Sequence, residues 1–297
     1  MFARISRGWE LTKQSGRVLM SDKQLVLFPI LSSIALLLVL ATFAIPMFFA
    51  VDFATLIKEA EQAGANGGDK RIPMQPWYYI VLFAFYFVNF FVITFFNSAL
   101  VACAINRFNG QDSSMKAGLA VATSRLPQIL MWAALAATVG MVLKMIEERL
   151  GWLGKFVINL IGMVWTIATF FVVPVLVVEK VGPFDAVKRS VQILKKTWGE
   201  TLVANLGIGA VGMLATLLAL MPAIAGVVLT ATLNSVVPII IGIAITVLLL
   251  IAVSLIVSTL KMILLAATYR FAATGEVPSG FDAQLLQQAF KPKGQKA

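Results

Sequence analysis

The sequence contains no histidine and a single cysteine. Histidine is the commonest general base and transition-metal ligand in proteins, so its absence excludes the HExxH type of intramembrane protease. The lone Cys103 excludes an internal disulfide and leaves the redox compartment open. We therefore expect no metal, no cofactor and no catalytic group of these kinds.

Charged residues are also scarce, at 13% of the 297 residues, whereas 60% are hydrophobic. This balance indicates an integral membrane protein rather than a soluble domain with one anchor. The 14 Asp and Glu residues all lie in or beside connecting segments. A proton-driven transporter usually needs an ionisable relay at membrane depth, so that class is disfavoured.

The apolar runs predict an all-α integral membrane protein, a single domain over residues 1–297 with about six transmembrane helices in hairpins. The first apolar run, 25–50, is longer than the ~7–15 residues of a signal-peptide core, so we expect it to be an uncleaved span. The segment 221–237 is apolar and uncharged, which predicts a short helix that lies in the interface or re-enters the membrane. The six spans are expected near residues 25–50, 77–105, 126–143, 156–178, 201–220 and 238–260.

A polar, basic and helix-forming segment, 183–200, stands out from these runs. Its apolar residues recur at steps of three and four, which places them on one stripe of an α-helix. The pattern predicts an amphipathic helix on the membrane surface. The stripe consists of Phe184, Val187, Val191, Leu194 and Trp198. The basic residues outside it are Lys188, Arg189, Lys195 and Lys196.

The segments 1–24 and 106–125 carry related patterns. A shift of 182 residues aligns Arg7 with Arg189 and Lys13 with Lys195, and places Trp9 on the stripe. A shift of 72 residues places a similar stripe in 106–125, and a weaker echo begins at Gly280. The similarity is explained either by duplication or by the general tendency of helices between spans to be amphipathic.

The distribution of basic residues predicts the orientation. Of the 24 Lys and Arg residues, 17 lie in the segments 1–24, 106–125, 179–200 and 270–297, and 6 lie in 51–76, 144–155 and 222–237. Positive residues are retained in the cytoplasm. We therefore expect both termini, the amphipathic helices and the tail 270–297 to be cytoplasmic.

Two short motifs match enzyme signatures but lack the context that those signatures need. The run from Gly207 to Gly212 reads GxGxxG, yet it lies within a predicted span with no preceding strand, so we interpret it as a groove for close helix approach. Ser258 and Lys261 form an SxxK pair, as in serine–lysine hydrolases. We expect Lys261 to extend toward the cytoplasmic surface instead.

Polar residues within the predicted spans allow two interpretations. Asn89 and Asn97 are eight residues apart and hence on nearly one helix face. Hydrogen bonds between helices are the favoured role for them. The alternative is a polar pathway for a solute, whose candidate residues are Asn89, Asn97, Asn159 and Lys261.

The runs VVPVLVVEKVGPFDAVKRSVQILKKTWGETL and FARISRGWELTKQSGRVLMSDKQLVLFPIL resemble a family of bacterial multi-pass inner-membrane proteins of unknown function. More distantly, they resemble the membrane domain fused to some bacterial glycerophosphodiester phosphodiesterases, whose cytoplasmic helices are similarly basic and Trp-containing. The resemblance implies a bacterial inner-membrane location and a helical-hairpin architecture. It implies no reaction, because this chain has no room for the soluble phosphodiesterase barrel.

These observations favour a non-enzymatic membrane scaffold or accessory subunit. Its expected partners are the bilayer and anionic headgroups, together with a further copy of the chain or another membrane protein, and nucleic acid is not expected. The expected contact residues are Arg7, Trp9, Lys13, Lys188, Arg189, Lys195, Lys196 and Trp198. A small channel or a solute or lipid transporter is the alternative, and an intramembrane hydrolase acting through Ser258 and Lys261 is the third hypothesis.

Overall fold

The computed structural model describes residues 2–50, 76–111, 113–150, 152–197, 200–283 and 285. These residues form helices joined by short turns, and no strand occurs among them. Six stretches are long and apolar enough to cross a membrane, which confirms the predicted all-α membrane class. These candidate spans are Lys23–Pro46, Tyr79–Phe108, Leu126–Glu147, Gly154–Glu179, Gly207–Leu233 and Val237–Thr274.

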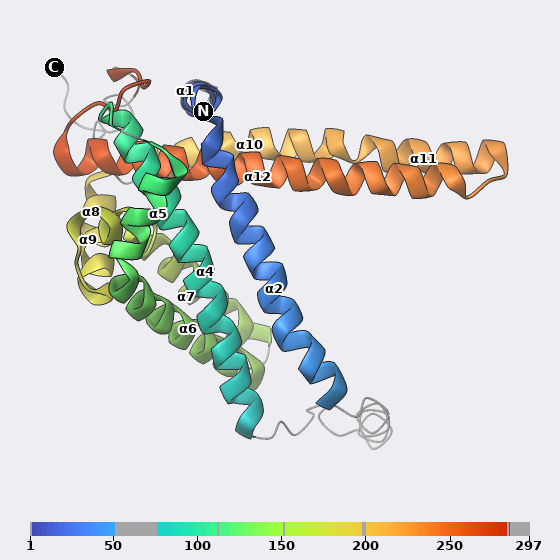
Figure 1. Cartoon of the computed structure of the whole chain (residues 1–297), viewed down its shortest axis with the longest axis horizontal. Helices are drawn as coiled ribbons and strands as arrows, with labels where there is room; N and C mark the ends of the chain where they lie inside the picture. The colour runs from blue at the N-terminus through green and yellow to red at the C-terminus, as the bar shows by residue number, and fades with distance from the viewer. Residues whose placement is uncertain are drawn as a thin grey trace.

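The chain follows a simple path through its helices (Figure 1). The first half contains α1 (Phe2–Ser21), the 3₁₀ helix η1 (Lys23–Val26), α2 (Leu27–Ala50), α4 (Pro76–Phe108), α5 (Met115–Ser124) and α6 (Leu126–Arg149). The second half contains α7 (Trp152–Ala168), α8 (Val172–Glu179), α9 (Pro183–Thr197), α10 (Glu200–Ala219), α11 (Met221–Leu233) and α12 (Val237–Thr274).

The fifth candidate span differs from the predicted one. The sequence predicts a span that ends at residue 220 and a separate interfacial or re-entrant helix over 221–237. In the structure α11 follows α10 after a single turn residue, Leu220, and the two extend in the same general direction (Figure 1). Pro222 explains the break, because proline lacks an N–H but fits the first turn of a new helix.

Three short helices, α1, α5 and α9, each precede a longer helical hairpin. We call them the interfacial helices, after the membrane-interface position that the sequence predicts for them. They lie toward the same end of the molecule, near the C-terminal part of α12 (Figure 1). A residue with a left-handed backbone follows each returning helix: Gly110 after α4 (φ 68°), Lys180 after α8 (φ 57°) and Gly275 after α12 (φ 77°). This recurring order is what a duplicated unit would give, and duplication remains a prediction.

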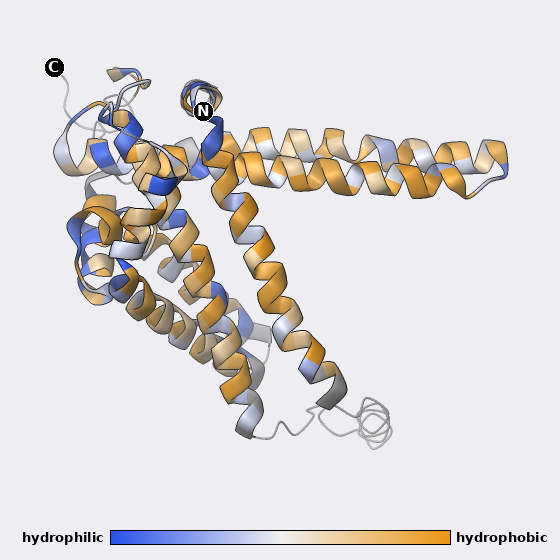
Figure 2. Ribbon diagram, in the orientation of Figure 1, coloured by the Kyte–Doolittle hydropathy of each residue, from blue (hydrophilic) through white to orange (hydrophobic). Residues whose placement is uncertain are grey.

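The buried core lies where the interfacial helices meet the spans. One cluster joins α1 and the start of α2 to the C-terminal parts of α4 and α12, with Leu25, Phe28, Leu100 and Ile263 fully buried. A second cluster packs α8 and α9 against α6 and α12 around Phe171. Elsewhere many large apolar side chains of the long helices are exposed. Figure 2 colours these helices hydrophobic along most of their length. Such a surface suits contact with lipid hydrocarbon.

The helices α10 and α11 pack beside the N-terminal part of α12 in a long hairpin, which we call the arm. The arm extends away from the other helices and in a different direction from α2 and α4 (Figure 1). It is coloured hydrophobic along most of its length (Figure 2). No charged residue occurs between Glu200 and Lys261 in the sequence.

Two glycines of the GxGxxG run confirm that it is a close-packing groove. A Cβ atom added at Gly207 would lie 2.5–2.8 Å from backbone atoms of Gly8, so α1 crosses α10 backbone to backbone. A Cβ at Gly212 would lie 3.1 Å from the Val257 side chain of α12. Gly209 faces open space.

Candidate interfacial site

The helix α9 buries a different face from the one that its apolar stripe suggested. The buried residues are Pro183, Ala186, Ser190, Ile193 and Leu194, and of these five only Leu194 belongs to the stripe. The stripe residue Phe184 is 74% exposed, and Lys188 and Lys195 are exposed as well. Because residues four and seven positions further along a helix return to the same side, Phe184, Lys188 and Lys195 share one outward face.

Contacts with α8 and α12 fix this rotation of α9. The Arg189 Nε donates to both carboxylate oxygens of Glu179, at 2.9 and 3.1 Å. The Tyr269 hydroxyl donates to the same carboxylate at 3.0 Å. The buried Ser190 hydroxyl accepts from the Phe171 backbone N–H at 3.0 Å. The bonds of Arg189 and Ser190 hold α9 against α8 and the residue before it, and the Tyr269 bond ties the shared carboxylate to α12, so α9 cannot turn without losing its two contacts.

Arg189 therefore belongs to the packing of α9 rather than to its outward face. The hydrogen bond to Glu179 raises the pKa of the Arg189 guanidinium above its ordinary value, so the group stays charged. A charge-assisted pair of this kind is stronger than a neutral hydrogen bond. The basic group predicted from the sequence thus divides into the structural Arg189 and the exposed Lys188 and Lys195.

The helix α1 presents a comparable outward face. Trp9 is 47% exposed, and Lys13 and Arg17 follow it at successive steps of four. The Lys13 ammonium lies 5.9 Å from the centroid of the Trp9 ring. Both Lys13 and Arg17 pair with the Glu10 carboxylate, at 3.3 and 3.4 Å. The face therefore combines an aromatic ring with partly neutralised basic groups.

The opposite side of α1 is buried. Leu11, Ser15 and Val18 are buried against the rest of the protein. The side-chain carbonyl of the buried Gln14 accepts from the Asp282 backbone N–H at 3.2 Å, which ties α1 to the chain that follows α12. A cavity of about 630 Å³ lies beside this contact. Its lining includes Glu10, Gln14, Arg17 and Asp282.

The outward faces of α1 and α9 share an aromatic residue followed four positions later by lysine, Trp9–Lys13 and Phe184–Lys188. Alignment of the two apolar stripes does not show this correspondence, because it places Lys13 on Lys195. The spacing of aromatic and lysine residues was the signal that could have found it. The third interfacial helix, α5, exposes Lys116 but has no aromatic residue.

Three of the predicted contact residues cannot be assigned a contact. Trp198 lies outside the described residues, and the side chains of Arg7 and Lys196 also lie outside what the structure describes. Their proposed part in lipid or partner binding stays a prediction. The described face therefore rests on Trp9, Lys13, Phe184, Lys188 and Lys195.

The residues of the predicted polar pathway lie on three helices. The Asn89 amide donates to the Phe85 carbonyl of its own helix at 2.7 Å, and Asn97 is half-buried on the same helix. Asn159 on α7 and Lys261 on α12 are exposed. None of them lines the cavity beside α1 or the groove in the arm. The pathway hypothesis thus stays a prediction.

The enzyme hypothesis has two candidate residues on α12. Ser258 is half-buried and Lys261 is exposed. Among the residues that the structure describes, no group of three or more Cys, Asp or Glu residues lies close enough together to hold a metal ion.

Comparison with known proteins places the chain in a family without assigning it an activity. No curated protein and no solved structure matches the chain. The distant resemblance to phosphodiesterase membrane domains therefore stays a prediction. The match that was found begins at Trp77, so it excludes α1 and α2 and includes α9. Residues 77–281 match the model of a family described as "Family of unknown function (DUF6159)", and the chain belongs to that family.

Proposed function

We propose that this protein is a non-enzymatic scaffold or accessory subunit of a bacterial inner membrane, with both termini in the cytoplasm. In this proposal the outward faces of α1 and α9 bind the anionic headgroups of the cytoplasmic leaflet. The observation that carries it is the shared arrangement of an exposed aromatic ring and a lysine four residues later, at Trp9–Lys13 and Phe184–Lys188.

The chemistry of these faces supports the proposal. Aromatic rings are favoured at the level of the headgroups, and lysines near an anionic surface each contribute about 1 kcal/mol of attraction. On α9, Lys188 and Lys195 are exposed, and the nearby cation Arg189 is held by Glu179. Phe184 and the two lysines are therefore available to contact the membrane, and the Arg189–Glu179 ion pair keeps their side of α9 facing outward.

The proposal can be tested on the full chain in bilayers that contain spin-labelled phosphatidylglycerol or phosphatidylcholine. The fraction of each motionally restricted lipid gives the preference of the protein for the anionic headgroup. We expect a preference that falls as salt is raised, and that falls roughly fivefold for each lysine removed, because about 1 kcal/mol is lost per charge. The variants are K13Q, K188Q and K195Q.

K116Q on α5 is the matched control, because Lys116 is exposed but has no aromatic residue on its helix. We expect it to change the lipid preference less than K188Q does. Equal preference for the two lipids in the unmodified protein would contradict headgroup binding. A preference that survives the combined K13Q, K188Q and K195Q changes would assign it to another surface.

A further inference from the structure

The distal part of the arm contains a repeated motif, Pro-x3-Gly-x3-Thr. It occurs at Pro222, Gly226 and Thr230, and again 16 residues later at Pro238, Gly242 and Thr246. Each copy begins a helix, since Pro222 lies in the first turn of α11 and Pro238 in the first turn of α12. The two copies run in opposite directions along the hairpin.

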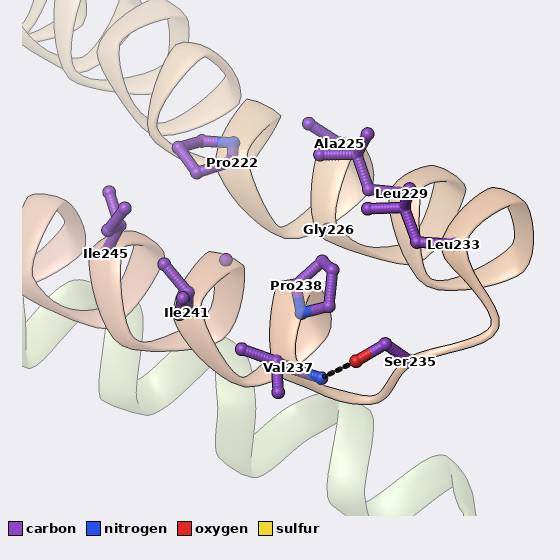
Figure 3. Close-up of a pocket in the computed structure, with 11 residues that line it drawn as sticks. Pro222, Ala225, Gly226, Leu229, Leu233, Ser235, Val237, Pro238, Ile241 and Ile245 are labelled. Atoms are coloured by element: carbon purple, nitrogen blue, oxygen red, sulfur yellow. Dashed lines mark hydrogen bonds between the residues drawn. The ribbon is translucent and has the colours of Figure 1, made fainter.

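The two copies are in direct contact. A Cβ atom on Gly226 would meet the carbonyl oxygen of Pro238 at 2.7 Å, and one on Gly242 would clash with the carbonyl oxygen of Pro222. A Cβ on Gly242 would also lie 3.2 Å from the Cα of Gly226. Figure 3 shows Pro222 and Pro238 on the facing sides of the two helices. Only glycine at these positions allows so close an approach.

The threonines satisfy the backbone donors beside the prolines. The Ala223 N–H, which follows Pro222, donates to the Thr246 hydroxyl at 3.0 Å. The Ile239 N–H, which follows Pro238, donates to the Thr230 hydroxyl at 3.2 Å. The first N–H groups of a helix have no partner within it, and each one left unpaired in hydrocarbon costs several kcal/mol. In the hairpin, a threonine of each helix therefore accepts a hydrogen bond from the first turn of the other helix.

Each backbone N–H group from Val237 to Ile240, in the first turn of α12, has a hydrogen-bond acceptor. The Val237 N–H donates to the Ser235 hydroxyl at 3.3 Å, as Figure 3 shows. Pro238 has no N–H, and the Ile240 N–H donates to the Val236 carbonyl at 3.4 Å. With Ile239 bonded to Thr230, this helix start needs no water.

The tip of the arm also differs from the other hairpin connections in charge. Its polar residues are Asn234 and Ser235, whereas the ends of α6 and α7 that flank their connection carry Lys144, Glu147, Glu148, Arg149 and Lys155. Leu233, Val236 and Val237 at the tip are 62%, 67% and 56% exposed. Exposed apolar residues without a flanking charge suit hydrocarbon rather than water.

The length and direction of the arm allow its tip to stay inside the bilayer. The span Gly207–Leu233 has 27 residues, which is about 40 Å of helix against about 30 Å of hydrocarbon. An arm parallel to the membrane normal would carry the tip through, whereas an arm of this length tilted by roughly 60° would reach a depth of only about 20 Å. The arm does leave the direction of α2 and α4 (Figure 1).

We propose that the distal arm, tip included, is an intramembrane surface whose partner is the acyl-chain region of the bilayer. The hairpin enters from the side of the interfacial helices, remains in hydrocarbon and returns. An open groove of about 510 Å³ forms part of this surface. It is lined by residues related by the same 16-residue shift, including Ala225 with Ile241 and Leu229 with Ile245.

The test uses S235C in the full chain, in a C103A background, within sealed membrane vesicles. A membrane-impermeant maleimide is applied from each side in turn. L150C, at the end of α6 beside the charged α6–α7 connection, is the aqueous control. We expect labelling of L150C from one side and loss of labelling of S235C from both sides. Labelling of S235C at the rate of L150C would overturn the proposal.

A second readout identifies what covers the tip. A permeant fluorophore attached at S235C should be quenched by lipids brominated on their acyl chains and not by iodide in the water. Disulfide formation between two S235C chains in the membrane, without quenching by brominated lipid, would show that a second copy covers the tip and would overturn the assignment to lipid.

The hydrogen bonds across the hairpin are tested with T230V and T246V. Each leaves one backbone N–H beside a proline without its acceptor, so we expect S235C to become reactive to maleimide. T232V is the matched control, because the exposed Thr232 donates to the Leu229 carbonyl of its own helix, at 3.1 Å. Protection that is unchanged in T230V and T246V would contradict the role given to the repeat. Neither readout depends on headgroup binding by α1 and α9.

Discussion

The contact between Arg189, Glu179 and Tyr269 gives the most sharply defined prediction, because it holds α9 in its observed rotation. Replacing Arg189 with Gln removes the guanidinium that donates to Glu179 at 2.9 and 3.1 Å. The Glu179 carboxylate then still accepts from the Tyr269 hydroxyl at 3.0 Å, but no longer has the positive guanidinium of Arg189 beside it. The adjacent Lys188 is exposed and serves as the control.

The magnitude lies between two limits. A hydrogen bond to a charged group contributes about 1.5–3 kcal/mol, whereas an exposed ion pair contributes about 0–1 kcal/mol. The side chains of Arg189 and Glu179 are 35% and 25% exposed, so solvent screens the pair in part. We therefore expect R189Q to lower the free energy of unfolding by about 1–2 kcal/mol. K188Q should change it by less than about 0.5 kcal/mol.

Unfolding in mixed micelles with increasing dodecyl sulfate measures this difference. R189K should give an intermediate value, because lysine keeps the charge but loses the planar donor fork of arginine. Equal stability of R189Q and K188Q would refute the assignment of Arg189 to the packing of α9. So would a larger loss of anionic-lipid preference in R189Q than in K188Q at equal stability.

Two further predictions concern other helix contacts. G207A should lower the free energy of unfolding by about 1–3 kcal/mol, because its Cβ would meet the Gly8 backbone. G209A, which faces open space, should be neutral or raise the free energy of unfolding by up to about 1 kcal/mol. Equal effects of the two variants in thermal unfolding would contradict the close crossing of α1 and α10. N89L should change the free energy of unfolding by less than about 0.6 kcal/mol, because the Asn89 amide bonds within its own helix. If instead the protein carries a solute flux in liposomes, and N89L abolishes that flux while the variant still folds normally, the polar pathway would be supported.

The spans were predictable from the sequence because hydropathy is a local property. Runs such as Leu126–Glu147 contain enough apolar residues to identify a membrane helix without reference to any neighbour. The beginning of a separate helix at Met221 was equally readable, because Pro222 favours the first turn of a new helix, but the direct continuation of α10 into α11 after Leu220 was not.

The rotation of α9 was not predictable in the same way. The three-and-four spacing identifies a stripe of apolar residues, but the buried face is set by polar contacts of Arg189 and Ser190. Their partners, the Phe171 backbone and Glu179, lie outside α9, so one helix in isolation does not reveal them. The Pro-x3-Gly-x3-Thr repeat was readable in the sequence, but its meaning depends on which threonine faces which proline.

The sidedness of the interfacial helices tests the central claim most directly. K13C and K195C, each in a C103A background, are exposed to an impermeant maleimide in right-side-out and in inverted inner-membrane vesicles. Both positions are outward-facing in the structure. The account predicts labelling of both only in inverted vesicles, where the cytoplasmic face is outside. Labelling of either position in right-side-out vesicles would contradict it.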